Sequence, residues 1–309
     1  MHPDEGPLPL DFYTLGRGLA YLAALALIGS CVFITLIPRW RSNDDDDRSL
    51  AARALTRAWS VAAAAAALLI GADLLRAWGQ VRSFLDPGEP LTWDAAGPVL
   101  LATGWGRGWQ LQLLVALASL PVALLARRRP ATGLALLGTT SLAVAAVSPL
   151  TGHAVEHPWG RSLGIGLHAV HLIGGGVWLG TLLTMVLAGL RPATLGDAPA
   201  VARMVAVFSP VALCGAALAV VAGTLLALAY VGDVSSLVGT TYGRTLLSKL
   251  GLLGVTMAFG AWNWRRVRPR LGSGSATQSL TRSASIELLI GLLLVAATAI
   301  LVALPAPRI

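Results

Sequence analysis

The chain has 309 residues, of which 55% are hydrophobic and only 12% are charged, about half the charged share of a typical soluble domain. Several apolar runs reach the roughly 20 helical residues needed to cross the 30 Å hydrocarbon core of a bilayer. The composition therefore excludes an ordinary soluble domain and predicts an all-α, polytopic membrane protein.

The formal net charge of +8 does not point to nucleic acid, because the arginines are clustered between apolar runs. The clusters are Arg39, Arg41, Arg48, Arg53 and Arg57; Arg127, Arg128 and Arg129; Arg191 and Arg203; and Arg265, Arg266, Arg268 and Arg270. These are alternate loops, and positively charged loops are typically cytoplasmic. We therefore expect a multi-pass protein of the cell (inner) membrane with both termini extracytoplasmic.

Eight spans are predicted along the chain. They cover residues 12–38, 54–80, 106–127, 131–150, 160–189, 201–231, 242–264 and 284–305. The first residues, MHPDEGPLPLDFY, lack the positive region of a secretory signal, so we expect the first run to be retained as a span. The polar segments 41–50 and 271–282 are expected to be cytoplasmic linkers.

The two halves of the chain contain similar segments in the same order. LALIGSCVF at 25–33 matches VHLIGGGVW at 170–178, and TGWGRGWQLQLL at 103–114 matches TTYGRTLLSKLG at 240–251. Four spans per half give both halves the same orientation in the membrane. We therefore predict two parallel four-helix repeats, residues 1–150 and 151–309, related by an axis along the membrane normal.

Four of the five histidines lie between residues 148 and 185. His168 and His171 share one face of the predicted fifth span because they are three residues apart, and His171 lies roughly 16 Å deep. Ionisable side chains at that depth usually mark a pathway or site. The alternative is that each imidazole only hydrogen-bonds to a neighbouring helix.

The other two histidines precede this span. His153 and His157, with Glu156 between them, offer two nitrogens and a carboxylate at the membrane surface, a donor set that suits Cu(II), Zn(II) or Ni(II). A polar exterior loop with incidental histidines is the alternative. His157 and His171 are on the order of 20 Å apart along a straight helix, too far for one ion, so we expect capture outside and relay within.

Glycines in LIGGGVWLG, at 172–180, are expected to allow close helix packing, with a gating bend as the alternative. Among the other polar residues of the spans, Asp73, Gln110, Gln112 and Lys249 could line one outward-facing cavity. Asp73 could instead form a local ion pair with Arg76, three residues away, and Lys249 could extend to the interface.

The later part of the chain contains GHA at 152–154, HLIGGGVWLG at 171–180, SP at 209–210, YGRTLLSKLGLL at 242–253 and WNWRRVRPRL at 262–271. Together these motifs resemble the copper resistance D (CopD) family of bacterial inner-membrane proteins. The resemblance extends over about residues 148–271; the first half matches through its span pattern.

The resemblance implies an eight-span protein that moves copper across the cytoplasmic membrane, alongside a periplasmic copper-binding partner of the CopC type. It places His153 and His171 at the family's histidine positions, whereas His157 and His168 are additions of this chain. We expect no enzymatic activity and no organic cofactor, with the copper ion as substrate.

The resulting hypothesis is copper transport, with uptake preferred because the predicted ligands lie toward the outer side. No P-loop of the form GxxxxGK[ST] occurs, so a gradient, the membrane potential or a partner would drive it. Copper affinity should fall below about pH 6 as the histidines are protonated. The alternatives are a haem-binding redox protein, disfavoured because all intramembrane histidines lie on one span, and a non-transporting copper sensor or assembly factor.

Overall fold

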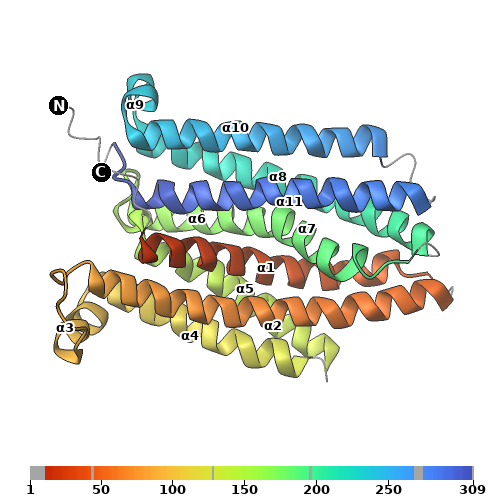
Figure 1. Ribbon diagram of the computed structural model, residues 1–309, viewed down its shortest axis with the longest axis horizontal. Coiled ribbons are helices and arrows are strands. Elements are labelled where there is room, and N and C mark those ends of the chain that lie inside the picture. Colours follow the sequence, from red (N-terminus) through yellow and green to blue (C-terminus); the bar gives the residue numbers. More distant parts are fainter. Residues whose placement is uncertain (1–10, 43–44, 127–128, 195–196, 268–273, 308–309) are drawn as a thin grey trace.

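The computed structural model describes residues 11–42, 45–126, 129–194, 197–267 and 274–307. This part of the chain is a bundle of long helices that run along one axis and contains no strand (Figure 1). Eight helices in it are long and apolar enough to cross a membrane. The expected all-α, polytopic fold is confirmed, and each predicted span overlaps one of these helices.

The elements follow one another along the chain with short connections. They are α1 (Phe12–Trp40), α2 (Asp45–Arg82), α3 (Trp93–Gly97), η1 (Pro98–Ala102), α4 (Gly104–Leu125), α5 (Pro130–Val147), η3 (Ser148–Thr151), η4 (His153–Glu156), α6 (Arg161–Gly175), η5 (Gly176–Gly180), α7 (Thr181–Thr184), η6 (Met185–Leu190), α8 (Ala198–Val231), α9 (Val234–Gly239), α10 (Thr241–Trp262), η8 (Asn263–Val267) and α11 (Gly274–Ala303). The segments α6, η5, α7 and η6 form one continuous fifth span, which contains two π-helical stretches.

The two polar linkers are shorter than predicted. Helix α2 already begins at Asp45 and α11 at Gly274, so the later parts of segments 41–50 and 271–282 are helical. Residues 43–44 and 268–273 lie outside the described part of the chain.

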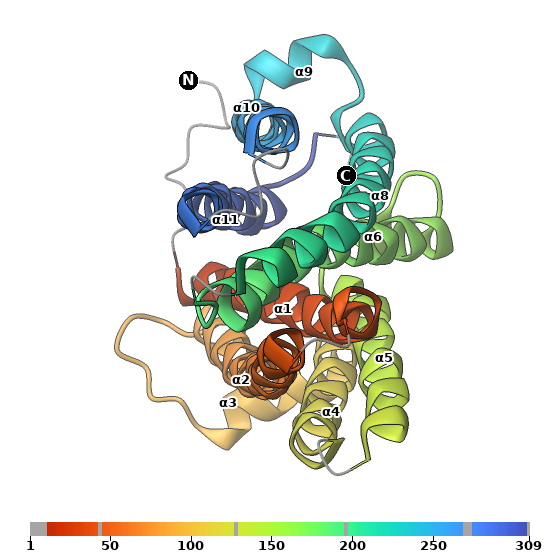
Figure 2. The ribbon, with the colours of Figure 1, turned by 90° about the vertical axis from the view of Figure 1, so that its right-hand side faces the viewer.

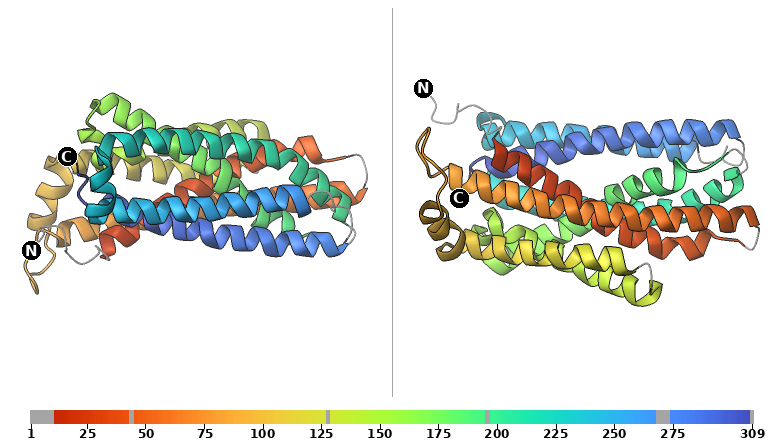
Figure 3. Two further views of the ribbon diagram at one scale, coloured as in Figure 1. Left: turned by 90° about the horizontal axis from the view of Figure 1, so that it is seen from above. Right: turned by 60° about the horizontal axis from the view of Figure 1, so that its bottom comes forward.

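Helix α1 lies at the centre of the bundle, between a group formed by α2, α4 and α5 and another formed by α6, α8, α10 and α11 (Figures 2 and 3). It crosses the fifth span where two glycines meet. A Cβ atom on Gly29 would lie 1.9 Å from the carbonyl carbon of Gly180, and one on Gly180 would lie 1.9 Å from the Leu25 oxygen. Only glycine fits at this crossing, which confirms the close-packing role expected for the glycine motif.

The matching segments of the two halves adopt the same local structure. Thr103 caps α4 by accepting a hydrogen bond from the Gly106 N–H at 2.8 Å, and Thr240 caps α10 by accepting one from Gly243 at 3.0 Å. A short helical segment precedes each cap, and a Cβ on either glycine would collide with its carbonyl groups. The threonine and glycine shared by the two segments therefore have the same structural role in both halves. The division into two repeats stays a prediction.

Candidate metal centre

The segment between α5 and α6 carries His153 and His157 on two short turns. His153 begins η4, and His157 follows it with an extended backbone, as expected for a residue that precedes proline. The chain then turns at Gly160, whose N–H donates to the His157 oxygen at 2.9 Å and whose φ of 104° favours glycine. The two histidines are therefore not on one helical face.

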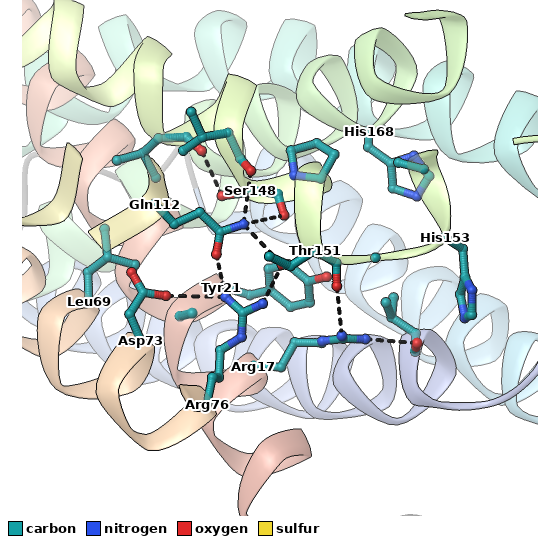
Figure 4. Close-up of a pocket in the computed structure, with 17 residues that line it drawn as sticks. Arg17, Tyr21, Leu69, Asp73, Arg76, Gln112, Ser148, Thr151, His153 and His168 are labelled. Atoms are coloured by element: carbon teal, nitrogen blue, oxygen red, sulfur yellow. Dashed lines mark hydrogen bonds and ion pairs between the residues drawn. The ribbon is translucent and has the colours of Figure 1, made fainter. Parts of the chain in front are cut away.

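A small cavity of about 30 Å³ lies under this segment. Its volume exceeds the roughly 10–15 Å³ that a cavity needs to hold one water molecule. His153 and His168 lie at one end of it and Asp73 and Gln112 at the other (Figure 4). The fold thus brings together one histidine predicted for outer capture and one predicted for the membrane interior.

Three histidines donate a ring proton to a backbone carbonyl. His153 Nε2 lies 3.2 Å from the Leu304 oxygen, His168 Nδ1 lies 2.9 Å from the Gly164 oxygen, and His171 Nδ1 lies 2.7 Å from the Ala219 oxygen. A carbonyl oxygen only accepts, so each contacting nitrogen carries the proton and the other ring nitrogen keeps its lone pair. Histidines that bind metals are commonly oriented in this way.

His157 has the opposite arrangement. Its Nδ1 accepts a hydrogen bond from the Trp159 N–H at 3.1 Å, so in the neutral ring Nε2 carries the proton. That Nε2 is buried and has no hydrogen-bond partner within the described chain. The ring packs edge-on against Trp159 and Tyr230, with centroids 5.6 and 5.1 Å away, and burial lowers its pKa. This orientation suits packing better than metal binding.

Glu156, the predicted oxygen ligand, is exposed at the end of η4. It lies close enough to His153 to act on its charge. It does not line the cavity beneath that histidine.

His171 faces a different neighbour from His168. Its ring contacts α8, where a Cβ on Gly223 would lie 2.9 Å from the Cε1 atom of the imidazole. The missing side chain at this glycine makes room for the ring. His168 instead faces the cavity and Tyr230, with ring centroids 5.9 Å apart. Across the described ranges, no three His, Cys, Asp or Glu side chains are grouped to hold one metal ion.

A buried polar network forms the other end of the cavity. Arg76 Nη1 donates to Asp73 Oδ1 at 3.2 Å and to Gln112 Oε1 at 2.6 Å, while its Nη2 donates to Thr151 Oγ1. The Gln112 amide donates to the Ser148 oxygen at 3.0 Å and also to Thr151 Oγ1 at 3.0 Å. The predicted Asp73–Arg76 pair is confirmed, and the network holds the turn that precedes His153.

Arg17 binds the same turn from α1. Its guanidinium donates to the Thr151 oxygen at 3.2 Å and to the Val302 oxygen at 2.8 Å. Sequence reasoning missed Arg17 and Thr151. Arg17 could have been noticed as a charged residue within a long apolar run, since such residues are rare and functional.

The four polar residues predicted to line one cavity separate in the structure. Asp73 and Gln112 line it. Gln110 instead donates to the Leu100 oxygen at 2.7 Å. Lys249 is half-buried on α10 and is absent from the cavity wall.

The cavity is positively charged overall, because its described wall holds Arg17 and Arg76 against the single carboxylate of Asp73. Burial lowers the pKa of His153, and the neighbouring guanidinium of Arg17 lowers it further. The imidazole is therefore held in its neutral form, which is the form that binds metals.

Comparison with known proteins connects the chain to copper. A family model for the copper resistance protein D-like N-terminal domain matches residues 9–160, and one for copper resistance protein D matches residues 202–301. The two matches together cover well over half of the chain. The chain belongs to the copper resistance D (CopD) family.

One curated relative of this CopD-family chain is the copper transport protein CutJ of Bacillus subtilis (strain 168), which is 28% identical over 159 residues. The matched segment covers 51% of this chain and 28% of the relative's length. No solved structure matches the chain. Family and relative together indicate a copper-related function in a membrane.

Proposed function

We propose that the protein transports copper ions across the cytoplasmic membrane, in the direction of uptake, without catalysing a reaction. The observation that supports this most is the shared cavity of His153 and His168, in which each ring has one nitrogen bound to a carbonyl and one left with its lone pair. Two nitrogens can accept one copper ion there as the transported substrate.

The next ligand along the route is His171. It lies three residues further along α6, about 4.5 Å at 1.5 Å per residue, and its free nitrogen is the Nε2. An ion passed from His168 to His171 moves from the cavity to the contact between α6 and α8. Because each step offers few ligands, copper would bind weakly enough to leave again, and transport requires release as well as binding.

Sulfur has no part in the proposed route. Met185 and Met204 are fully buried in the hydrophobic core, where methionine serves as an adaptable packing residue. Copper would instead be delivered by a periplasmic partner of the CopC type to the outer turn, which carries His153 and the exposed Glu156.

The test is copper flux into proteoliposomes that contain wild type, His168→Gln or His171→Gln. We expect at least a tenfold loss of flux in either variant, with thermal stability close to that of wild type because glutamine can still donate to a carbonyl. Equal flux in all three proteins would contradict the relay.

The same preparations separate the alternatives. Copper binding without flux in the wild type would favour a sensor or assembly factor. A Soret band with stoichiometric haem would favour a redox protein.

A further inference from the structure

A groove on the outside of the bundle lies between α1, the fifth span and α11. Its volume is about 250 Å³, and its lining is leucine, valine and glycine except for Ser285 and Arg191. Leu289 and Leu292 of α11 stand at its rim and are 59% and 44% exposed. In a membrane such an opening faces the acyl chains of lipid, so the groove is accessible to them.

One end of the groove carries the only charged residue of its described lining. Arg191 directly follows Leu190, the last residue of the fifth span, which places its guanidinium at the depth of the headgroups. Arg191 is exposed, and its side chain has no hydrogen-bond or ion-pair partner within the described residues. It is therefore available to an anion from the membrane.

The length of the groove matches one leaflet. On α11 the lining extends from Ser285 to Val295, about 15 Å along the helix at 1.5 Å per residue. This is half of the roughly 30 Å hydrocarbon core. An acyl chain whose headgroup lies beside Arg191 would end near Leu22 and Val295.

We propose that this groove is a binding site for an anionic phospholipid. One acyl chain fills the apolar groove, and the phosphate accepts hydrogen bonds from Arg191, whose planar guanidinium suits bidentate contact with phosphate. The uncompensated charge of Arg191 selects a lipid with net negative charge over a zwitterionic lipid with the same chains. The site is separate from the histidine cavity and does not depend on copper transport.

The test is native mass spectrometry of the delipidated, detergent-solubilised chain with phosphatidylglycerol or phosphatidylcholine of identical chains. We expect wild type to retain phosphatidylglycerol several-fold better. Arg191→Gln should remove that preference while phosphatidylcholine binding stays unchanged. The control is Arg57→Gln, which removes another exposed arginine, from α2, and should behave as wild type. Equal lipid preference in the two variants would overturn the proposal.

A second pair of variants tests the groove itself. Gly291→Leu fills it, because a Cβ there would already lie 3.2 Å from a Leu179 methyl group, whereas Gly251 on α10 has nothing within 4 Å. We expect Gly291→Leu to reduce binding of both lipids and Gly251→Leu to leave it unchanged.

Should Gly291→Leu fail to fold, Val295→Phe narrows the deep end of the groove, and Leu293→Phe on the exposed side of α11 is its control. Undiminished phosphatidylglycerol binding in the folded groove variants would show that the lipid binds elsewhere.

Discussion

The hydrogen-bond partner of each histidine ring determines which ring nitrogen carries the proton and which keeps its lone pair. His153 and His168 donate to carbonyls and keep a lone pair on the other nitrogen, whereas His157 accepts from a backbone N–H. The residue type is the same in all three cases. The hydrogen-bond partner leaves one ring nitrogen with its lone pair free in His153 and His168, whereas in His157 the lone pair is already used.

Substitution of two neighbouring histidines should therefore have different effects on copper binding. We expect His168→Phe to weaken binding at least tenfold, because it removes a lone pair from the cavity. His157→Phe should change it by less than twofold, because phenylalanine can occupy the same contact with Tyr230. Isothermal titration of copper into the purified variants measures both. A loss of copper affinity greater than twofold in His157→Phe would show that His157 is a ligand.

Copper binding should persist to more acidic solution than free histidine allows. Burial and Arg17 both lower the pKa of His153, so its ring stays neutral below the ordinary histidine pKa of about 6.5. Binding is present while the ring is neutral and is lost as the pH falls through the lowered pKa. A titration of copper affinity against pH should show the loss below pH 6.5, and a midpoint above it would contradict this.

At the scale of the helices, a few glycines determine how closely two helices can pack. Helix α1 reaches the centre of the bundle because Gly29 and Gly180 let two backbones meet. The sequence indicated this contact through its glycine motif. It could not indicate which helix packs against the motif, because small residues permit the close approach of any helix.

Substitution at this crossing should destabilise the bundle. Gly29→Val forces a side chain into the Gly180 backbone, which cannot move out of the way, and we expect a cost at or above the 1–3 kcal/mol typical of overpacking. Gly71→Val on α2 is the control, because nothing lies within 4 Å of its Cβ position. The midpoint of thermal unfolding in detergent measures both. Similar midpoints would show that the crossing can relax.

The whole molecule is held together at one end by charged residues from the first half of the chain. Arg17 of α1 and Arg76 of α2 bind the turn between α5 and α6, and Arg17 also binds Val302 after a separation of 285 residues. These contacts fix the turn that carries His153 onto the bundle. They could not be predicted from the sequence, because they join residues that are far apart in the chain.

Replacing only Arg76 of the Asp73–Arg76 ion pair should reduce the stability of the protein more than replacing both residues. Both side chains are almost fully buried, and a buried charge left without its partner typically costs 3–5 kcal/mol. We expect Arg76→Gln to lower the midpoint of thermal unfolding strongly and the double variant Asp73→Asn with Arg76→Gln to recover part of the loss. A double variant no more stable than Arg76→Gln would show that hydrogen bonds, and not the charge, dominate.

The sequence by itself determined the number of spans, their all-helical form and the concentration of histidines near one end. Backbone groups in lipid must be satisfied within the segment, so a long apolar run can only be a helix. Only the tertiary structure decided that His153 and His168 share a cavity, that His171 faces α8 and that His157 accepts a backbone hydrogen bond and packs against Tyr230. Each of those outcomes depends on which distant carbonyl or helix lies opposite the ring, such as Leu304 or Ala219, and local spacing carries no information about residues so far along the chain.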